Sequence, residues 1–127
     1  MSDIVGRALV LVEGLSLWGG MDPATGELID AHHPQRGASL TGRVVVMPSG
    51  RGSSSSASVL AEAVRAKTAP AAILLGEPDL ILDIGSAVAE ELYGTVVPVL
   101  VLEAKQLAAI RDGEIVRIGH DGTVGTG

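Results

Sequence analysis

RVVVMPSGRGSSSSASVLAEAVRAK, residues 43–67, decides the fold. It opens with a β-branched run, Arg43 to Met47, which Pro48 closes as in a buried strand. Glycine and serine dominate residues 48–58. In residues 59–64, apolar side chains then recur at helical spacing, with charged residues outside their stripe. The stretch therefore predicts a strand, a Gly/Ser loop and a helix in direct succession.

Strands and helices continue to alternate after this stretch. Compact aliphatic runs predict strands, and segments with helical spacing or a capping residue predict helices between them. The expected elements are a strand at Ala71–Leu75, a helix from Asp79 to Gly94, a strand at Thr95–Leu102, a helical turn at Lys105–Ile110 and a strand at Glu114–Ile118. Strand–helix–strand succession implies right-handed crossovers and parallel neighbours. We therefore predict an α/β domain with a partly parallel sheet.

Both ends of the helix from Asp79 to Gly94 carry capping signals, because Asp is a favoured N-cap residue and Gly a favoured C-cap residue. Glu90 and Glu91 lie outside its apolar stripe, and we expect them to be exposed. A glycine inside a helix costs about 1 kcal/mol relative to Ala. At Gly85, therefore, either another backbone packs closely or the helix begins only afterwards. The apolar residues at helical spacing are Ile81, Ile84, Val88 and Leu92.

The first third of the chain shows strand and turn signals without a helical period. Apolar pieces predict strands at Ile4–Val12, Leu15–Trp18 and Glu27–Asp30, separated by Gly and Asp-Pro turns. We treat residues 1–120 as a single domain. The Gly- and Thr-containing tail, residues 121–127, is expected to stay loose or to form one short edge strand, since it has little apolar area to bury.

Composition excludes several classes of protein. The chain has 127 residues, 46% of them hydrophobic, and no Cys. It therefore has no disulfide scaffold, no thiolate nucleophile and no metal centre held by its own thiolates. A net charge of −6 with scattered basic residues disfavours nucleic acid as a partner. No signal peptide and no membrane-spanning run is recognisable, so we expect a cytoplasmic protein.

The Gly50–Ser53 loop is the first candidate site. Backbone amides in a Gly-rich turn that opens a helix, with the helix dipole behind them, favour a bound carboxylate or phosphate. Arg51 adds a guanidinium that can hold a carboxylate by two hydrogen bonds. The simpler interpretation is that Ser53 or Ser54 caps the helix. The loop lacks the Gly-Lys-Ser/Thr ending of a nucleotide P-loop.

Two further segments are weaker candidates. Trp18-Gly19-Gly20 with Asp22 combines glycines that allow close backbone approach with the only Trp, which either anchors an interface or belongs to the core. The neighbouring pair His32-His33 has no further ligand at metal-binding spacing. For the two histidines a surface loop is the favoured interpretation, and we predict no metal site.

Four motifs in this order resemble the small subunit of the aconitase X family: residues 16–22 (SLWGGMD), Thr25-Gly26, residues 30–34 (DAHHP) and residues 48–56 (PSGRGSSSS). The resemblance extends from about Gly14 to about Leu102. It implies a swivelling β/β/α domain that closes over an active site on a large subunit. That subunit would carry the iron–sulfur cluster and its cysteines, so that this chain binds no cofactor itself.

The resemblance also implies a function, that of a hydro-lyase subunit. Members of the family resemble cis-3-hydroxy-L-proline dehydratases or mevalonate 5-phosphate dehydratases. The Trp18, His32-His33 and four-serine pattern is closer to the first, so the expected substrate is a small hydroxy acid, cis-3-hydroxy-L-proline. We expect a heterodimer that is inactive without its large subunit. The phosphate ester remains the alternative substrate, and a stand-alone module binding a small anion or a partner remains the alternative function.

Residue roles follow from the same resemblance. The serine after the family's Gly-x-Gly is the proton-abstracting base, which corresponds to Ser53. Arg51, Gly52 and Ser54 are then substrate neighbours. Gly19, Gly20 and Asp22 are expected at the closing interface or the edge of the site.

Overall fold

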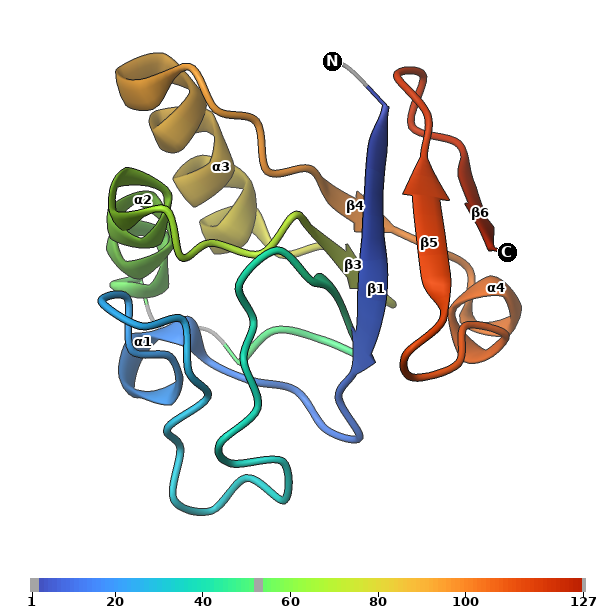
Figure 1. Cartoon of the computed structure of the whole chain (residues 1–127), viewed down its shortest axis with the longest axis horizontal. Helices are drawn as coiled ribbons and strands as arrows, with labels where there is room; N and C mark the ends of the chain where they lie inside the picture. Colours follow the sequence, from blue (N-terminus) through green and yellow to red (C-terminus); the bar gives the residue numbers. More distant parts are fainter. Residues whose placement is uncertain (1–2, 52–53, 127) are drawn as a thin grey trace.

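The computed structural model describes residues 3–51 and 54–126, which form one six-stranded sheet flanked by helices (Figure 1). The strand order is β4-β3-β2-β1-β5-β6. Strands β4, β3, β2 and β1 run parallel to one another, and β5 pairs antiparallel with both β1 and β6. Their bounds are Ile4–Val10 (β1), Val44–Met47 (β2), Ala72–Leu75 (β3), Val99–Val101 (β4), Ile115–Ile118 (β5) and Val124–Thr126 (β6). The predicted α/β class with a partly parallel sheet is confirmed.

Alternate residues of the strands pack into two hydrophobic cores, one on each face of the sheet. Leu9, Val45 and Ile73 belong to the core that contains residues of helices α2 (Ser56–Ala66) and α3 (Leu80–Tyr93). The intervening Ala8 and Val44 belong to a second core. The short helix α4 (Ala104–Ala108) packs against that second core through Leu107. Because successive side chains of a strand point to opposite faces, this division places α2 and α3 on one face of the sheet and α4 on the other (Figure 1).

The two large helices pack through small residues. A Cβ on Gly85 of α3 would lie 3.0 Å from both the Cα and the carbonyl oxygen of Ala57 in α2. The close approach of a second backbone, one of the two explanations offered for this glycine, is therefore confirmed. Asp79 and Gly94 are the N-cap and C-cap of α3, as predicted.

The buried face of α3 carries one large apolar residue and two small ones. Its buried residues are Leu82, Gly85 and Ala89. Ile84, Val88 and Leu92, whose spacing predicted the helix, are 40–63% exposed. At Gly85, close packing against α2 leaves room only for a small side chain, and the bulky Ile84 and Val88 lie outside the buried face. Glu90 and Glu91 are exposed as expected.

The first third consists mainly of loops closed by single β-bridges. After β1, the bridges Leu15 with Gly50, Met21 with Leu28 and Glu27 with Ser39 take the place of the strands predicted at Leu15–Trp18 and Glu27–Asp30. The segment Leu17–Gly20 (α1) is classified as a helix, but Trp18 and Gly19 have non-helical backbone angles. Buried Leu15, Leu17, Met21, Leu28 and Leu40 extend the core beneath these loops.

The end of the chain adds β6 antiparallel to β5. Of the two outcomes considered for the tail, the short edge strand is the one the structure shows. In the described part of the chain, no helix combines the length and apolarity needed to cross a bilayer.

Candidate functional site

The Gly/Ser loop, residues 48–55, connects β2 to α2 at the carboxyl edge of the parallel strands. In open α/β sheets this edge is where ligands bind. The structure describes residues 48–51, 54 and 55 of the loop. Gly52 and Ser53, the predicted substrate neighbour and base, lie outside the described residues. Ser54 is exposed in the turn that precedes α2.

Arg51 is the charged residue of this loop. Its guanidinium is 62% exposed, and its Nη1 lies 4.0 Å from Oε1 of Glu13. At that distance and exposure the pair is a weak, solvent-screened one. The planar guanidinium therefore keeps the capacity to bind a carboxylate through two parallel hydrogen bonds.

The helix after the loop begins later than the capping interpretation placed it. Ser55 occupies the N-cap position and Ser56 is the first helical residue, so the interpretation of Ser53 or Ser54 as the cap is wrong. Ser56 is only 2% exposed. It lies four residues before Leu60 on the buried face of α2, and burial at this spacing follows from the helical period.

Ser56 joins the loop helix to the Leu17–Gly20 segment. Its Oγ accepts a hydrogen bond from the backbone amide of Trp18 at 3.2 Å and lies 3.2 Å from Oγ of Ser16. In addition, the amide of Arg51 donates to the carbonyl of Leu15 at 3.4 Å. The two glycine-containing segments that the sequence singled out therefore meet, and α1 lies beside α2 (Figure 1).

The three residues predicted at the closing interface, Gly19, Gly20 and Asp22, differ in their exposure and contacts. Gly19 has a φ of +80° and is exposed, and a Cβ at this position would meet no other atom within 4 Å. Gly20 is buried, where a Cβ would lie 2.6 Å from Cδ1 of Leu15. Asp22 accepts a hydrogen bond from the amide of Ala24 at 2.9 Å and so stabilises its own turn. Gly20 and Asp22 therefore have a structural role whatever else they do.

Trp18 is not a core residue. It is 59% exposed, although its backbone amide is held by Ser56. Of the two interpretations of this residue, the structure contradicts the one that buries it. An exposed indole beside the loop is available for contact with another surface.

His33 is a buried structural residue, so the surface-loop interpretation is wrong for it and holds for exposed His32. Its Nδ1 accepts the amide of Gln35 at 3.0 Å, and its Nε2 lies 3.2 Å from the carbonyl oxygen of Glu13. The neutral tautomer with the proton on Nε2 satisfies both contacts. Both ring nitrogens are therefore engaged in holding loops together.

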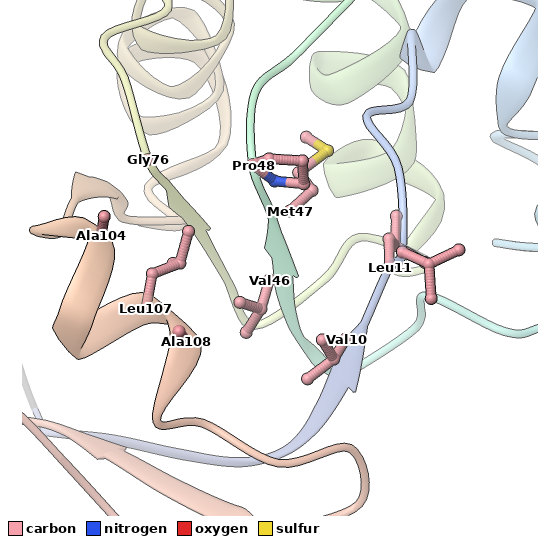
Figure 2. Close-up of a pocket in the computed structure, with 10 residues that line it drawn as sticks. Val10, Leu11, Val46, Met47, Pro48, Gly76, Ala104, Leu107 and Ala108 are labelled. Carbon is pink, nitrogen blue, oxygen red and sulfur yellow. The ribbon is translucent and has the colours of Figure 1, made fainter.

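An apolar groove of about 430 Å³ lies beside the loop (Figure 2). It starts at Pro48 and runs between the ends of β1 and β2 and helix α4. None of the predicted site residues lines it. Its walls are Val10, Leu11, Val12, Val46, Met47, Pro48, Gly76, Ala104, Leu107 and Ala108.

The sequence did not predict two contacts at the ends of the loop. One is the partly buried Ser16–Ser56 pair, whose members lie 40 residues apart in sequence. The other is Asp79, predicted only as a cap, whose carboxylate also lies against Gly50. Only the position of Ser56 on the buried stripe of α2 could have indicated from the sequence that this serine is buried. Contacts between separate loops produce no periodic pattern in the sequence.

The chain is similar to one protein family and to two groups of dehydratases. Residues 2–126 match the family model described as the aconitase X swivel domain. The chain is 52% identical over 97 residues to a cis-3-hydroxy-L-proline dehydratase of Pseudomonas aeruginosa, covering 76% of this chain and 17% of that protein. It is 47% identical over 79 residues to a phosphomevalonate dehydratase small subunit of Methanopyrus kandleri, covering 62% of this chain and 58% of that protein.

The fold also matches a solved structure. The crystal structure of Thermococcus kodakaraensis aconitase X in its holo form superposes with a TM-score of 0.85 at 29% identity, over 98% of this chain and 90% of the other. The fold expected from the resemblance, that of an aconitase X swivel domain, is thereby confirmed. The chain spans less than one fifth of the length of the proline dehydratase named above, at 17%.

Proposed function

The chain belongs to the aconitase X swivel domain family, and we propose that it forms one side of the active site of a dehydratase, a hydro-lyase of the aconitase X type. The family match along residues 2–126 carries this proposal. The meeting of the Gly/Ser loop with the Leu17–Gly20 segment at the carboxyl edge of the sheet supports it. The Pseudomonas aeruginosa and Methanopyrus kandleri relatives are both named as dehydratases or their subunits.

The other side of the site belongs, in this proposal, to a large subunit. The aligned region makes up only 17% of the Pseudomonas aeruginosa relative, so most of that protein lies outside what this chain resembles. The Methanopyrus kandleri relative is itself named a small subunit. We therefore expect this chain to be inactive until it forms a heterodimer with a cysteine-containing large subunit.

An iron–sulfur cluster does not fit the residues of this chain. Such clusters are held by Cys thiolates, and the chain contains no Cys. Within residues 3–51 and 54–126 no group of three or more His, Asp and Glu is placed to hold a metal ion. We assign the cluster to the large subunit.

We assign the base to Ser53, with Arg51, Gly52 and Ser54 as substrate neighbours. Removal of a carbon-bound proton next to a carboxylate requires a base within hydrogen-bond reach of that proton. A serine acts as a base only where its alkoxide is stabilised, and amides of a Gly-rich turn before a helix supply such stabilisation. The burial of Ser56 and its bond to the Trp18 amide support a base earlier in the four-serine run.

We propose cis-3-hydroxy-L-proline as the substrate. The 52% identity to the Pseudomonas aeruginosa enzyme of that name supports this choice. Mevalonate 5-phosphate is the second candidate, because several relatives are named phosphomevalonate dehydratase small subunits, at up to 47% identity. Either substrate carries a carboxylate that the exposed Arg51 guanidinium can bind.

The decisive experiment is reconstitution of this chain with its large subunit and assay of both substrates. Dehydration of cis-3-hydroxy-L-proline is expected, and activity on the phosphate ester alone would refute the substrate. Ser53→Ala is expected to abolish turnover without preventing assembly. Ser58→Ala, which removes an exposed hydroxyl on α2, is the matched control. Full activity of Ser53→Ala would refute the assignment of the base.

A further inference from the structure

The carboxylate of Asp79 has two neighbours, and only one of them is explained by helix capping. Its Oδ1 accepts the amide of Leu82 at 3.0 Å, which caps α3. Its Oδ2 occupies the place that a side chain on Gly50 would need, so that a Cβ there would collide with it. Ser caps helices about as well as Asp does, and its shorter side chain would leave this second place empty.

Gly50 is confined from two sides. On one side it forms a parallel bridge with Leu15. On the other it faces the Asp79 carboxylate and Cδ1 of Leu82, which would lie 3.5 Å from a Cβ on Gly50. Gly50 is not one of the glycines with a left-handed φ. The position therefore needs a missing side chain rather than unusual backbone freedom.

We propose that Asp79 is a positioning residue of the active site, because its carboxylate fixes where the Gly/Ser loop leaves the sheet at Gly50. The next residue, Arg51, and the proposed base, Ser53, follow directly from this point. A displaced starting point would turn the Arg51 guanidinium away from the substrate. The inference rests on the proposed function and adds a residue from α3 to that site.

Steric complementarity predicts the behaviour of two Asp79 variants in the complete enzyme, this chain with its large subunit. Asp79→Asn keeps both the cap and the shape, and is expected to retain kcat within roughly threefold. Asp79→Ser keeps the cap but empties the space beside Gly50. Since misplacement of a reacting group by about 1 Å costs about 100-fold, kcat of Asp79→Ser should fall roughly 10- to 100-fold, with a smaller change in KM.

The double variant tests the contact itself. Gly50→Ala alone should reduce kcat strongly, because the new methyl group collides with the carboxylate. In the Asp79→Ser background the same substitution should cost much less, since residues in contact couple and independent residues do not. Asp83→Ser, in the exposed first turn of the same helix, is the matched control and should behave as wild type.

A second readout does not depend on turnover. In the amide NMR spectrum of the chain, Asp79→Ser should shift the signals of Gly50 and Arg51, whereas Asp83→Ser should not. If Asp79→Ser is too unstable to assay, Asp79→Thr provides a second variant with a short capping side chain. Wild-type kcat in Asp79→Ser, or an equal cost of Gly50→Ala in both backgrounds, would overturn the inference. Absence of dehydratase activity in the wild type would instead refute the proposed function, while unmoved Gly50 and Arg51 signals would still refute the role of Asp79.

Discussion

Gly85 of α3 lies against the backbone of Ala57 in α2, where a Cβ on Gly85 would lie only 3.0 Å from the Cα of Ala57. This contact sets the spacing of the two helices that cover one face of the sheet. It also favours burial of the side of α3 that carries Gly85 and Ala89, because a close backbone contact admits only a small residue at that point.

Gly85→Ala should therefore destabilise the chain although Ala is the better helix former. The helix gains about 1 kcal/mol from the substitution, but overpacking against an α2 backbone that cannot easily move costs about 1–3 kcal/mol. We expect a net loss of about 1 kcal/mol, measured by urea unfolding. Ala87→Gly, at an exposed position of the same helix, measures the propensity term alone. An increase in stability of Gly85→Ala would show that α2 yields.

Local signals predicted most of the elements of this fold. β-Branched residues marked Val44–Met47, and a capping residue at each end marked Leu80–Tyr93. The sequence could not predict which face of α3 is buried, because the answer depends on a contact with Ala57 from another helix. Bulky residues at helical spacing normally indicate the core face, and here packing reversed that preference.

The candidate site was predictable in its parts but not in its assembly. The Gly/Ser loop and the Leu17–Gly20 segment both stand out in the sequence. That they are joined through Ser16 and Ser56 depends on tertiary structure. The burial of His33 likewise depends on the carbonyl of Glu13, which lies in a different loop.

His33→Ala should destabilise the first third of the chain. It leaves the carbonyl of Glu13 and the amide of Gln35 without the imidazole that now bonds both. A buried polar group without a partner costs about 1–3 kcal/mol, and urea unfolding should show a loss in this range. His32→Ala removes an exposed imidazole and should change stability by less than about 0.5 kcal/mol. Equal effects of the two substitutions would contradict the structural role of His33.

Arg65 should control the acidity of Glu62. The hydrogen bond from the Arg65 side chain, aided by its charge, lowers the pKa of Glu62 below its usual range. A lowered folded-state pKa means that the pair stabilises the fold above the unfolded-state pKa of Glu and is lost as the pH falls through the folded-state value. Arg65→Met should raise the Glu62 pKa in a carbon-13 NMR titration, and Arg65→Lys should raise it less. An unchanged pKa in Arg65→Met would show that the pair is not formed in solution.

Trp18 should report on contact with the large subunit. It is the only Trp of the chain and 59% exposed, next to the proposed site. Interfaces exclude water from exposed aromatic residues at their centre. The fluorine NMR signal of 5-fluorotryptophan in this chain should therefore shift when the large subunit binds. Formation of the complex with an unchanged signal would place the interface elsewhere.

Ser56→Ala should weaken the link between helix α2 and the Leu17–Gly20 segment. The hydroxyl of Ser56 accepts the Trp18 amide and pairs with Ser16, so its loss leaves an amide without its partner. We expect a loss of about 1–2 kcal/mol in urea unfolding, whereas Ser58→Ala, at an exposed position of the same helix, should have little effect. Ser16→Ala should cost less in the Ser56→Ala background than alone, because the two hydroxyls share one contact. Additive losses would mean that the Ser16 and Ser56 hydroxyls act independently, and that the Trp18 amide alone ties the loop helix to the Leu17–Gly20 segment.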